Sequence, residues 1–294
     1  MDQALSYYLE QGQTLVNAYL HDYISEKPIH SNLKKSMLYS IHAGGKRLRP
    51  ILMMAACEAF GGNKKEVLPV AAALEMIHTY SLIHDDLPAM DDDDMRRGQP
   101  TNHRKFDEAT AILAGDALLT LSFQAIMEAE QLSVEQKVHL VQQLSTASGA
   151  LGMVAGQLMD MESEGKAITL EDLEQIHHLK TGKLLSFALM AGAYIGGASE
   201  QQLQSIKETA DLLGIIFQIQ DDILDVSGNE EKLGKPVGSD STNHKSTYPS
   251  MLGLEGSVTQ KEHYVAQAKS ALKQADVEET KLFILIDHLS NRDH

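Results

Sequence analysis

The chain has 294 residues, of which 43% are hydrophobic, and a formal net charge of −16. This length allows one large domain or two average ones. The acidic balance argues against nucleic acid and anionic membranes as partners, because both attract basic surfaces. The single cysteine, Cys57, excludes an internal disulfide framework and fits a reducing compartment. Without a signal-peptide pattern or an uninterrupted apolar run of membrane-span length, we expect a soluble cytoplasmic protein with no membrane span.

Apolar residues recur at helical spacing along most of the chain, and Ala and Leu dominate over Val, Thr and the aromatic residues. No strand-like alternation, repeat or Pro/Ser-rich linker interrupts this pattern, and the longest non-helical stretch is 228–249. We therefore predict an all-α fold with a single domain over residues 1–294. The expected helices are 4–25, 33–41, 51–60, 67–83, 108–131, 134–162, 170–195, 203–226 and 259–290.

An acidic segment follows the apolar run 67–83. Asp85 and Asp86 stand where this helix should end, because the residue before Pro88 disfavours helix, and four carboxylates follow at 91–94. Carboxylates are unfavourable at the C-terminus of a helix, where the macrodipole favours cations. The pattern indicates a hard, oxygen-seeking cation such as Mg²⁺. The alternative is a solvated acidic loop, which remains the interpretation of 92–94.

A second group of carboxylates, Asp221, Asp222 and Asp225, lies in the apolar helix 203–226, with Gln218 one turn before Asp222. A buried carboxylate is costly unless it is paired or bound to metal, so this group also calls for a cation. The alternative is the solvent face of an amphipathic helix. Neither acidic group fits a calcium loop, which needs Gly at its sixth position, and no zinc-ligand spacing occurs.

Cations cluster near both acidic groups in an otherwise acidic chain. Arginine forks bind phosphate oxygens in pairs, and lysine supplies a point charge. Two carboxylate clusters with several cations are the components of a Mg²⁺-bridged diphosphate site. His78 lies two turns before Asp85, on the same helical face. The cations are Lys46, Arg49, Arg96 and Arg97 near the first group, and Lys180, Lys235 and Lys245 near the second or further along.

Together these segments resemble the trans-prenyltransferases of the isoprenyl diphosphate synthase family, most closely its bacterial farnesyl type. The resemblance covers nearly the whole chain. Four residues separate Asp86 from Asp91, as in the farnesyl type, whereas His244 stands where the family pattern has Gly. The segments that carry it are 45–50 (GKRLRP), 78–91 (HTYSLIHDDLPAMD), 96–98 (RRG), 180–182 (KTG), 217–222 (FQIQDD) with Asp225, and Lys235 and Lys245.

The resemblance implies a helical bundle around a central cavity, of the isoprenoid synthase type, and a homodimer. It also implies a Mg²⁺-dependent head-to-tail (1′-4) condensation of isopentenyl diphosphate with an allylic diphosphate. Dimethylallyl and geranyl diphosphate would be the allylic substrates, and farnesyl diphosphate and diphosphate the products. Several Mg²⁺ ions are expected, with Mn²⁺ as an alternative.

The resemblance assigns roles to the site residues. Product length would be set beneath the first acidic segment, where helical spacing indicates Ser81 and Leu82 and the resemblance indicates Tyr80. The metal ligands would be Asp85, Asp86, Asp91, Asp221, Asp222 and Asp225, with Asp85, Asp86, Lys180 and Asp221 catalytic. The allylic diphosphate would contact Arg96, Lys180, Thr181, Gln218, Lys235 and Lys245, and isopentenyl diphosphate would contact Lys46, Arg49, His78 and Arg97.

Four alternatives remain open. A geranyl or geranylgeranyl diphosphate synthase would belong to the same family and differ in product length. A helical His-Asp phosphohydrolase, suggested by His84-Asp85, would need further histidine ligands and leaves the second acidic group unexplained. A terpene cyclase would share the fold but replace the second acidic group. An acidic helical scaffold would bind no diphosphate.

Overall fold

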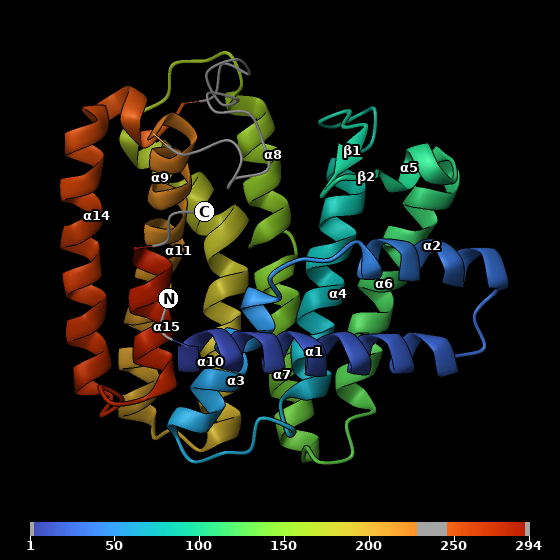
Figure 1. Ribbon diagram of the computed structural model, residues 1–294, viewed down its shortest axis with the longest axis horizontal. Coiled ribbons are helices and arrows are strands. Elements are labelled where there is room, and N and C mark those ends of the chain that lie inside the picture. The colour runs from blue at the N-terminus through green and yellow to red at the C-terminus, as the bar shows by residue number, and fades with distance from the viewer. Residues whose placement is uncertain (1–2, 228–245, 292–294) are drawn as a thin grey trace. The chain divides into compact units, whose positions relative to one another are not determined.

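The structure of this chain is a computed structural model that describes residues 3–227 and 246–291. Most of these residues lie in helices, which confirms the all-α fold class (Figure 1). In the described ranges the only sheet is an antiparallel hairpin of β1 (Met95–Arg96) and β2 (Gln99–Pro100). Lys235, His244 and Lys245 lie outside the described residues.

The chain divides into two compact units. The N-terminal unit comprises residues 2–54 and 63–141, and the C-terminal unit comprises 55–62 and 142–294 with Met1. Helices α3 (Leu48–Ala59) and α7 (Val134–Ser148) contribute residues to both units. Each unit carries one of the two acidic groups predicted from the sequence. The single domain over residues 1–294 stays a prediction.

The N-terminal unit is built on α4 and α6, which pack against each other. Gly115 of α6 allows this approach, because a Cβ there would lie 2.1 Å from Nε2 of His84 on α4. Pro69 lies in the first turn of α4, as expected for a residue that cannot donate a backbone hydrogen bond. The other helices of the unit cover this pair. The helices are α1 (Gln3–Glu26), α2 (Ser31–His42), α4 (Leu68–Asp85), α5 (Asn102–Lys105) and α6 (Glu108–Met127).

The C-terminal unit is built on α11, which packs against α10 and α14. Leu173, Ile219, Ile223 and Tyr248 form a buried cluster that joins α9, α11 and α14. A capping box at Thr169 starts α9, and a second at Thr247 starts α14. The elements are α8 (Met153–Ser163), α9 (Leu170–His177), the π-helical turn η1 (His178–Gly182), α10 (Lys183–Gly196), α11 (Glu200–Ser227), α14 (Tyr248–Gln274) and α15 (Lys281–Ser290).

Two predicted helices were wrong in extent. The segment 134–162 forms α7 and α8 instead of one helix, because Gly152 has φ −142° and ψ −126°, outside the helical region. The segment 259–290 was expected to hold one helix that begins at 259, but α14 begins at Tyr248 and ends at Gln274, and α15 follows. The start of α14 was not predicted because it lies at the end of the long polar stretch 228–249.

Helix α6 is the one described helix that is long and apolar enough to cross a membrane by length and composition. The prediction considered uninterrupted apolar runs, and Asp116 interrupts this one. Of its most apolar window, 44% is buried inside the structure. A core helix of a soluble protein has the same features, so the finding is weak support for a membrane span.

Candidate active site

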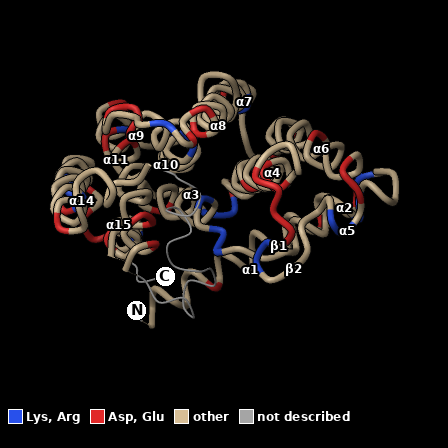
Figure 2. The backbone as a smooth tube through the Cα atoms, turned by 90° about the horizontal axis from the view of Figure 1, so that it is seen from above, with Lys and Arg blue, Asp and Glu red and all other residues tan. Residues whose placement is uncertain are grey.

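The first acidic group lies at the C-terminal end of α4, where the chain folds back on itself. The Asp91 N–H donates to the Asp85 carbonyl oxygen at 2.9 Å, and the Asp92 N–H donates to the Leu87 carbonyl at 3.1 Å. Asp92 has a positive φ of 51°, which Asp tolerates better than most residues. The turn therefore brings the backbones of Asp85 and Asp91 together. In Figure 2 the acidic tube between α4 and β1 marks this segment.

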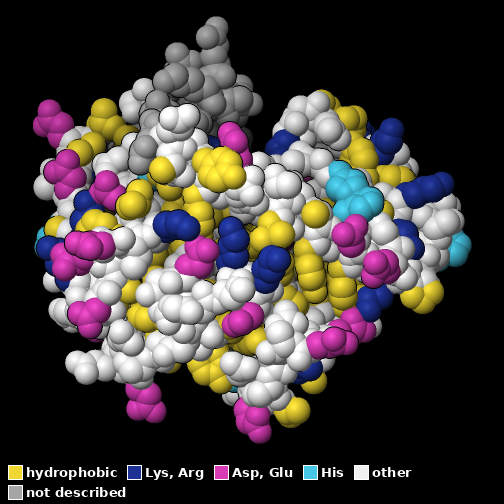
Figure 3. Space-filling model, turned by 60° about the horizontal axis from the view of Figure 1, so that its bottom comes forward, with side chains coloured by type: hydrophobic (Ala, Val, Ile, Leu, Met, Phe, Trp, Pro, Cys, Tyr) yellow, Lys and Arg dark blue, Asp and Glu magenta, His cyan; other side chains and the backbone are white. Residues whose placement is uncertain are grey.

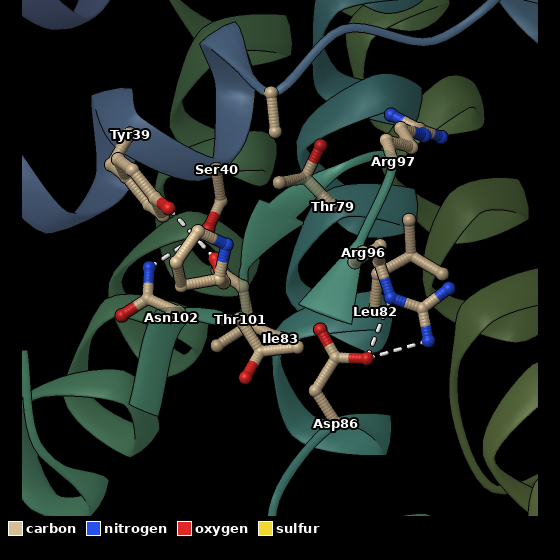
Figure 4. Close-up of a pocket in the computed structure, with 12 residues that line it drawn as sticks. Tyr39, Ser40, Thr79, Leu82, Ile83, Asp86, Arg96, Arg97, Thr101 and Asn102 are labelled. Atoms are coloured by element: carbon tan, nitrogen blue, oxygen red, sulfur yellow. Dashed lines mark hydrogen bonds and ion pairs between the residues drawn. The ribbon is translucent and has the colours of Figure 1, made fainter. Parts of the chain in front are cut away.

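Asp86 forms an ion pair with Arg96. Its carboxylate Oδ1 accepts Arg96 Nε at 2.6 Å and forms an ion pair with a terminal guanidinium nitrogen at 2.5 Å (Figure 4). Burial raises the pKa of Asp86, and Arg96 acts in the opposite direction. Burial alone would lower the pKa of Arg96, but the hydrogen bond and charge of Asp86 leave it raised. Arg96 also lies 3.3 Å from Asp93, so the acidic loop contributes to holding this side chain.

The hairpin between β1 and β2 places Arg97 beside the loop that follows α2. Arg97 and Gly98 both have positive φ, 52° and 76°, as a two-residue type I′ turn requires. The Arg97 guanidinium donates to the Gly44 carbonyl. Gly45 has φ 128°, and a Cβ there would lie 2.5 Å from Arg97 Nη1. The glycines before Lys46 thus allow the two basic motifs to meet.

The three cations of 46–49 have different surroundings. Arg47 is buried and structural: it pairs with Glu75 at 2.7 Å, donates to Asn17 at 2.8 Å and also donates to the Ile41 carbonyl. Lys46 is exposed. Arg49 has its Nε buried with no hydrogen-bond partner among the described residues. A buried donor without a partner needs an explanation, and an anionic ligand supplies one.

His78 lies on α4, and the charges of four arginines act on it. Burial, followed by the charges of Arg49, Arg97, Arg47 and Arg96, holds the pKa of His78 well below its usual range. The imidazole is therefore neutral at pH 7 and has one donor and one acceptor nitrogen. Burial and the neighbouring Arg97 also lower the pKa of Arg49, although Glu75 opposes this. Such a concentration of positive charge favours an anion.

A cavity of about 30 Å³ lies beside the Asp86–Arg96 pair in the N-terminal unit (Figure 4). Asp86, Arg96 and Arg97 line one part of it, and hydroxyl and amide side chains line another. Asn102 in this wall is held by Ser40 at 2.8 Å and by the Ser36 carbonyl at 3.0 Å. The remaining lining residues are Tyr39, Ser40, Ala43, Thr79, Leu82, Ile83, Pro100 and Thr101.

Tyr80 lies beneath the acidic segment and is buried. Its ring packs edge-on against His84, with centroids 5.7 Å apart. Burial and the charge of Asp85 raise the pKa of Tyr80 to about 12. Ser81 donates its hydroxyl to the His78 carbonyl at 2.9 Å, a local helical contact. His84 Nε2 lies 3.1 Å from the Ile112 carbonyl and packs on α6, which gives it a structural contact.

The second acidic group lies on α11 of the C-terminal unit. Asp222 and Asp225 are buried, whereas Asp221 is half-buried. Gln218 Nε2 donates to Asp222 Oδ1 at 3.3 Å, and Gln218 Oε1 accepts the Thr181 hydroxyl at 3.4 Å. Two predicted allylic-diphosphate contacts, Gln218 and Thr181, therefore lie side by side next to this group.

Lys180 and Thr181 lie in the π-turn η1, which packs closely against α8 and α11. A Cβ on Gly156 of α8 would lie 2.2 Å from the Lys180 backbone nitrogen, and a Cβ on Gly214 of α11 would lie 2.5 Å from Gly182 Cα. Turns of this type are frequent at functional sites. Lys180 Nζ is paired with Asp160 of α8 at 2.5 Å.

The sequence did not assign roles to four charged or titratable residues around these groups. Glu75 was visible as a lone carboxylate inside the apolar run 67–83, and Asp160 follows the glycine-rich segment around Gly156. Glu174 and His177 occupy one face of α9 at a spacing of three residues, before Lys180. For Glu174 and His177, only the spacing relative to Lys180 could have indicated a place near the site.

Oxygen ligands suit Mg²⁺, and the backbone hydrogen bond between Asp91 and Asp85 brings these two acidic residues together. Among the described residues, no group of three or more His, Cys, Asp and Glu side chains forms a complete metal site. Mg²⁺ is usually bound by one or two carboxylates together with substrate phosphates and water, so it does not require such a group.

Comparison with known proteins identifies the class. Residues 30–284 match the polyprenyl synthetase family, and the chain belongs to this family. It is 48% identical to the farnesyl diphosphate synthase of Bacillus subtilis (strain 168), with all of both chains covered. It is 50% identical to that of Geobacillus stearothermophilus, covering 98% of this chain and 97% of the relative. An FPP/GFPP synthase structure from Zymomonas mobilis shows 35% identity and a TM-score of 0.85, covering 99% of this chain and 100% of that one. The resemblance inferred from the motifs is confirmed, and the chain is a prenyltransferase.

Proposed function

We propose that this chain condenses isopentenyl diphosphate with dimethylallyl and then geranyl diphosphate, giving farnesyl diphosphate and diphosphate. The observation that carries the proposal is the group of arginines around a neutral His78, beside the Asp86–Arg96 pair. The similarity to the Bacillus farnesyl diphosphate synthase over the whole chain supports the product length.

Isopentenyl diphosphate would bind at Arg49, Arg97, His78 and Lys46. The buried Arg49 Nε, which has no hydrogen-bond partner in the described ranges, supports this assignment. Burial and the charge of Arg97 lower the pKa of Arg49, and the nearby neutral His78 adds a hydrogen-bonding group without a further charge. Arginine binds diphosphate oxygens through paired N–H groups, so the cluster suits this ligand.

Mg²⁺ would be held by Asp85, Asp86, Asp91, Asp221, Asp222 and Asp225, and Mn²⁺ is an alternative. When bound, the ion supplies positive charge that neutralises a departing diphosphate. Asp85 and Asp91 are the ligands best supported in the first group, because a backbone hydrogen bond joins them. Asp86 would act through its ion pair with Arg96 as well.

The chain's own residues would bind, orient and stabilise. Arg96, Lys180, Thr181, Gln218, Lys235 and Lys245 would hold the allylic diphosphate, so that cationic groups stabilise its negative charge as the allylic C–O bond breaks. The alkene of isopentenyl diphosphate would then attack the allylic carbon, and the released diphosphate would accept the proton that is lost. Tyr80, buried beneath Asp85, would limit product length.

We further propose that both units form one domain, and that the protein acts as a homodimer in the cytoplasm. Helix α6 supports an interface, because Ile112 and Leu113 are 43% and 58% exposed although the helix is highly apolar. Large apolar residues left exposed together mark interaction surfaces. Other hydrophobic side chains are exposed between charged groups on the face drawn in Figure 3.

The test is to measure which phosphate is released from which substrates. Purified protein with Mg²⁺ is incubated with dimethylallyl diphosphate, with isopentenyl diphosphate, and with both. The proposal predicts diphosphate release only when both are present. Orthophosphate released from either substrate alone would instead indicate a phosphohydrolase. Diphosphate from the allylic substrate alone would indicate a cyclase or lyase.

A further inference from the structure

The Asp222 carboxylate holds the start of α14. Asp222 lies on α11 with 3% exposure, and its Oδ2 accepts the Tyr248 backbone N–H at 3.0 Å. Tyr248 is the first residue of α14, and N–H groups in the first turn of a helix have no intrahelical acceptor. A side chain 26 residues away therefore satisfies this donor.

The Tyr248 side chain fixes the same junction from the other side. Tyr248 is fully buried, and its hydroxyl donates to Glu174 Oε1 on α9 at 2.9 Å. The Tyr264 hydroxyl donates to the same oxygen at 2.9 Å. Burial raises the pKa of Tyr248, so its hydroxyl remains a donor. The start of α14 is therefore tied to both α9 and α11.

His177 completes the surroundings of Asp222. Its ring stacks on Tyr248, with centroids 5.9 Å apart and planes 18° from parallel. His177 Nε2 is buried with no hydrogen-bond partner among the described residues, and it lies 3.9 Å from Asp222 Oδ2. Burial lowers the pKa of His177 to about 4, so the ring is neutral near pH 7.

The other carboxylate oxygen of Asp222 orients Gln218. An ionised carboxylate only accepts, so Asp222 Oδ1 selects the amide nitrogen of Gln218 at 3.3 Å. The amide oxygen of Gln218 then points to Thr181 at 3.4 Å. The result is a chain of contacts from α14 through Asp222 to two residues proposed to bind the allylic diphosphate.

We propose that Asp222 is a positioning residue, held by the Tyr248 backbone N–H, that sets the amide orientation of Gln218 and does not ligate the metal ion. This rests on the proposed function and revises one of its assignments. Both oxygens of Asp222 accept hydrogen bonds within the protein, whereas the adjacent Asp221 is half-buried and keeps the metal role. Glu174 supports Asp222 indirectly, through the Tyr248 hydroxyl.

The first arm of the test uses thermal unfolding with EDTA and no substrate. Asp222→Ala leaves the buried Tyr248 N–H without an acceptor and is expected to lower Tm by about 3–8 °C. Asp211→Ala, the control, breaks an exposed pair with Lys207 on the same helix and is expected to shift Tm by less than about 2 °C. An unchanged Tm for Asp222→Ala, or an equal loss in Asp211→Ala, would overturn the proposal.

The second arm measures Mg²⁺-dependent binding of inorganic diphosphate by calorimetry. Asp222→Asn keeps an acceptor for the Tyr248 N–H, so the Mg²⁺ concentration for half-saturation should stay within about twofold of the parent. Asp221→Asn should raise it about tenfold or more, because it removes a charged ligand. An equal rise in both variants would refute the positioning role. If the parent itself fails to bind diphosphate with Mg²⁺, the proposed function fails, while the EDTA arm still decides the role of Asp222.

Discussion

Two nitrogens of the Arg96 guanidinium lie within 2.6 Å of one carboxylate oxygen of Asp86, although the two residues belong to different motifs. The acidic segment at the end of α4 is thus joined to the basic hairpin that follows it. This relationship gives Asp86 a role that the sequence pattern did not contain. It holds a cation beside the proposed diphosphate site, in addition to any part in metal binding.

Asp86→Ala is expected to lower kcat by about 100-fold or more, because it removes a carboxylate and releases Arg96. The helical circular-dichroism spectrum should be unchanged. Asp94→Ala is the control, since Asp94 is 64% exposed and pairs only at the surface with Arg104. Near-parent activity of Asp86→Ala would contradict its place in the site.

Arg49→Gln is expected to raise the KM for isopentenyl diphosphate by about 10- to 100-fold, the value of one or two charge-assisted hydrogen bonds. The KM for the allylic substrate should change much less. Arg104→Gln, on the exposed surface, provides the comparison for a simple loss of positive charge. Equal effects on both substrates, or none, would exclude Arg49 as a specific contact for isopentenyl diphosphate.

Tyr80→Ala is expected to shift the product from C15 toward C20, because it removes a buried ring beneath Asp85. Ser81→Ala should leave the distribution nearly unchanged, since Ser81 donates to the backbone of its own helix. Reversed-phase separation of the dephosphorylated products measures both. A shift in Ser81→Ala and none in Tyr80→Ala would support the choice from helical spacing over that from the family resemblance.

Glu75→Ala is expected to lower the free energy of unfolding by about 3–5 kcal/mol, because it leaves Arg47 as an unpaired buried charge. Asp211→Ala breaks the exposed pair with Lys207 on α11 and should cost about 0.3–0.5 kcal/mol. Urea unfolding of both variants tests this. Similar losses would show that the Arg47–Glu75 pair contributes no more than a surface pair.

Stability should fall as the pH drops below about 6.5, the ordinary His pKa, partly because of His78. The pKa of His78 is lowered in the native state, so the unfolded state binds a proton in this pH range and the native state does not. Each such group lowers the free energy of unfolding by up to about 1.4 kcal/mol per pH unit. His78→Gln removes this contribution. The parent should therefore lose more stability between pH 7 and pH 5 than the variant. Parallel profiles would mean that His78 is not held neutral.

The helices around the first acidic group were predictable because α4 has a long apolar run and a proline stop. The different surroundings of Lys46, Arg47 and Arg49 could not be predicted, because a spacing of one or two residues does not tell which cation is buried. Arg47 adopts a positive φ of 49° and pairs with the buried Glu75, and neither feature is visible in the sequence. The contact of Asp222 with Tyr248 was equally hidden, because it joins residues far apart in sequence.

The central claim is tested most directly by the chain length of the product formed from dimethylallyl diphosphate, excess isopentenyl diphosphate and Mg²⁺. The account predicts farnesyl diphosphate as the main product, with geranyl diphosphate as a transient intermediate and diphosphate released in equal number to the bonds formed. A main product of C10 or C20 would contradict the farnesyl assignment. The absence of any condensed product would contradict the proposed function.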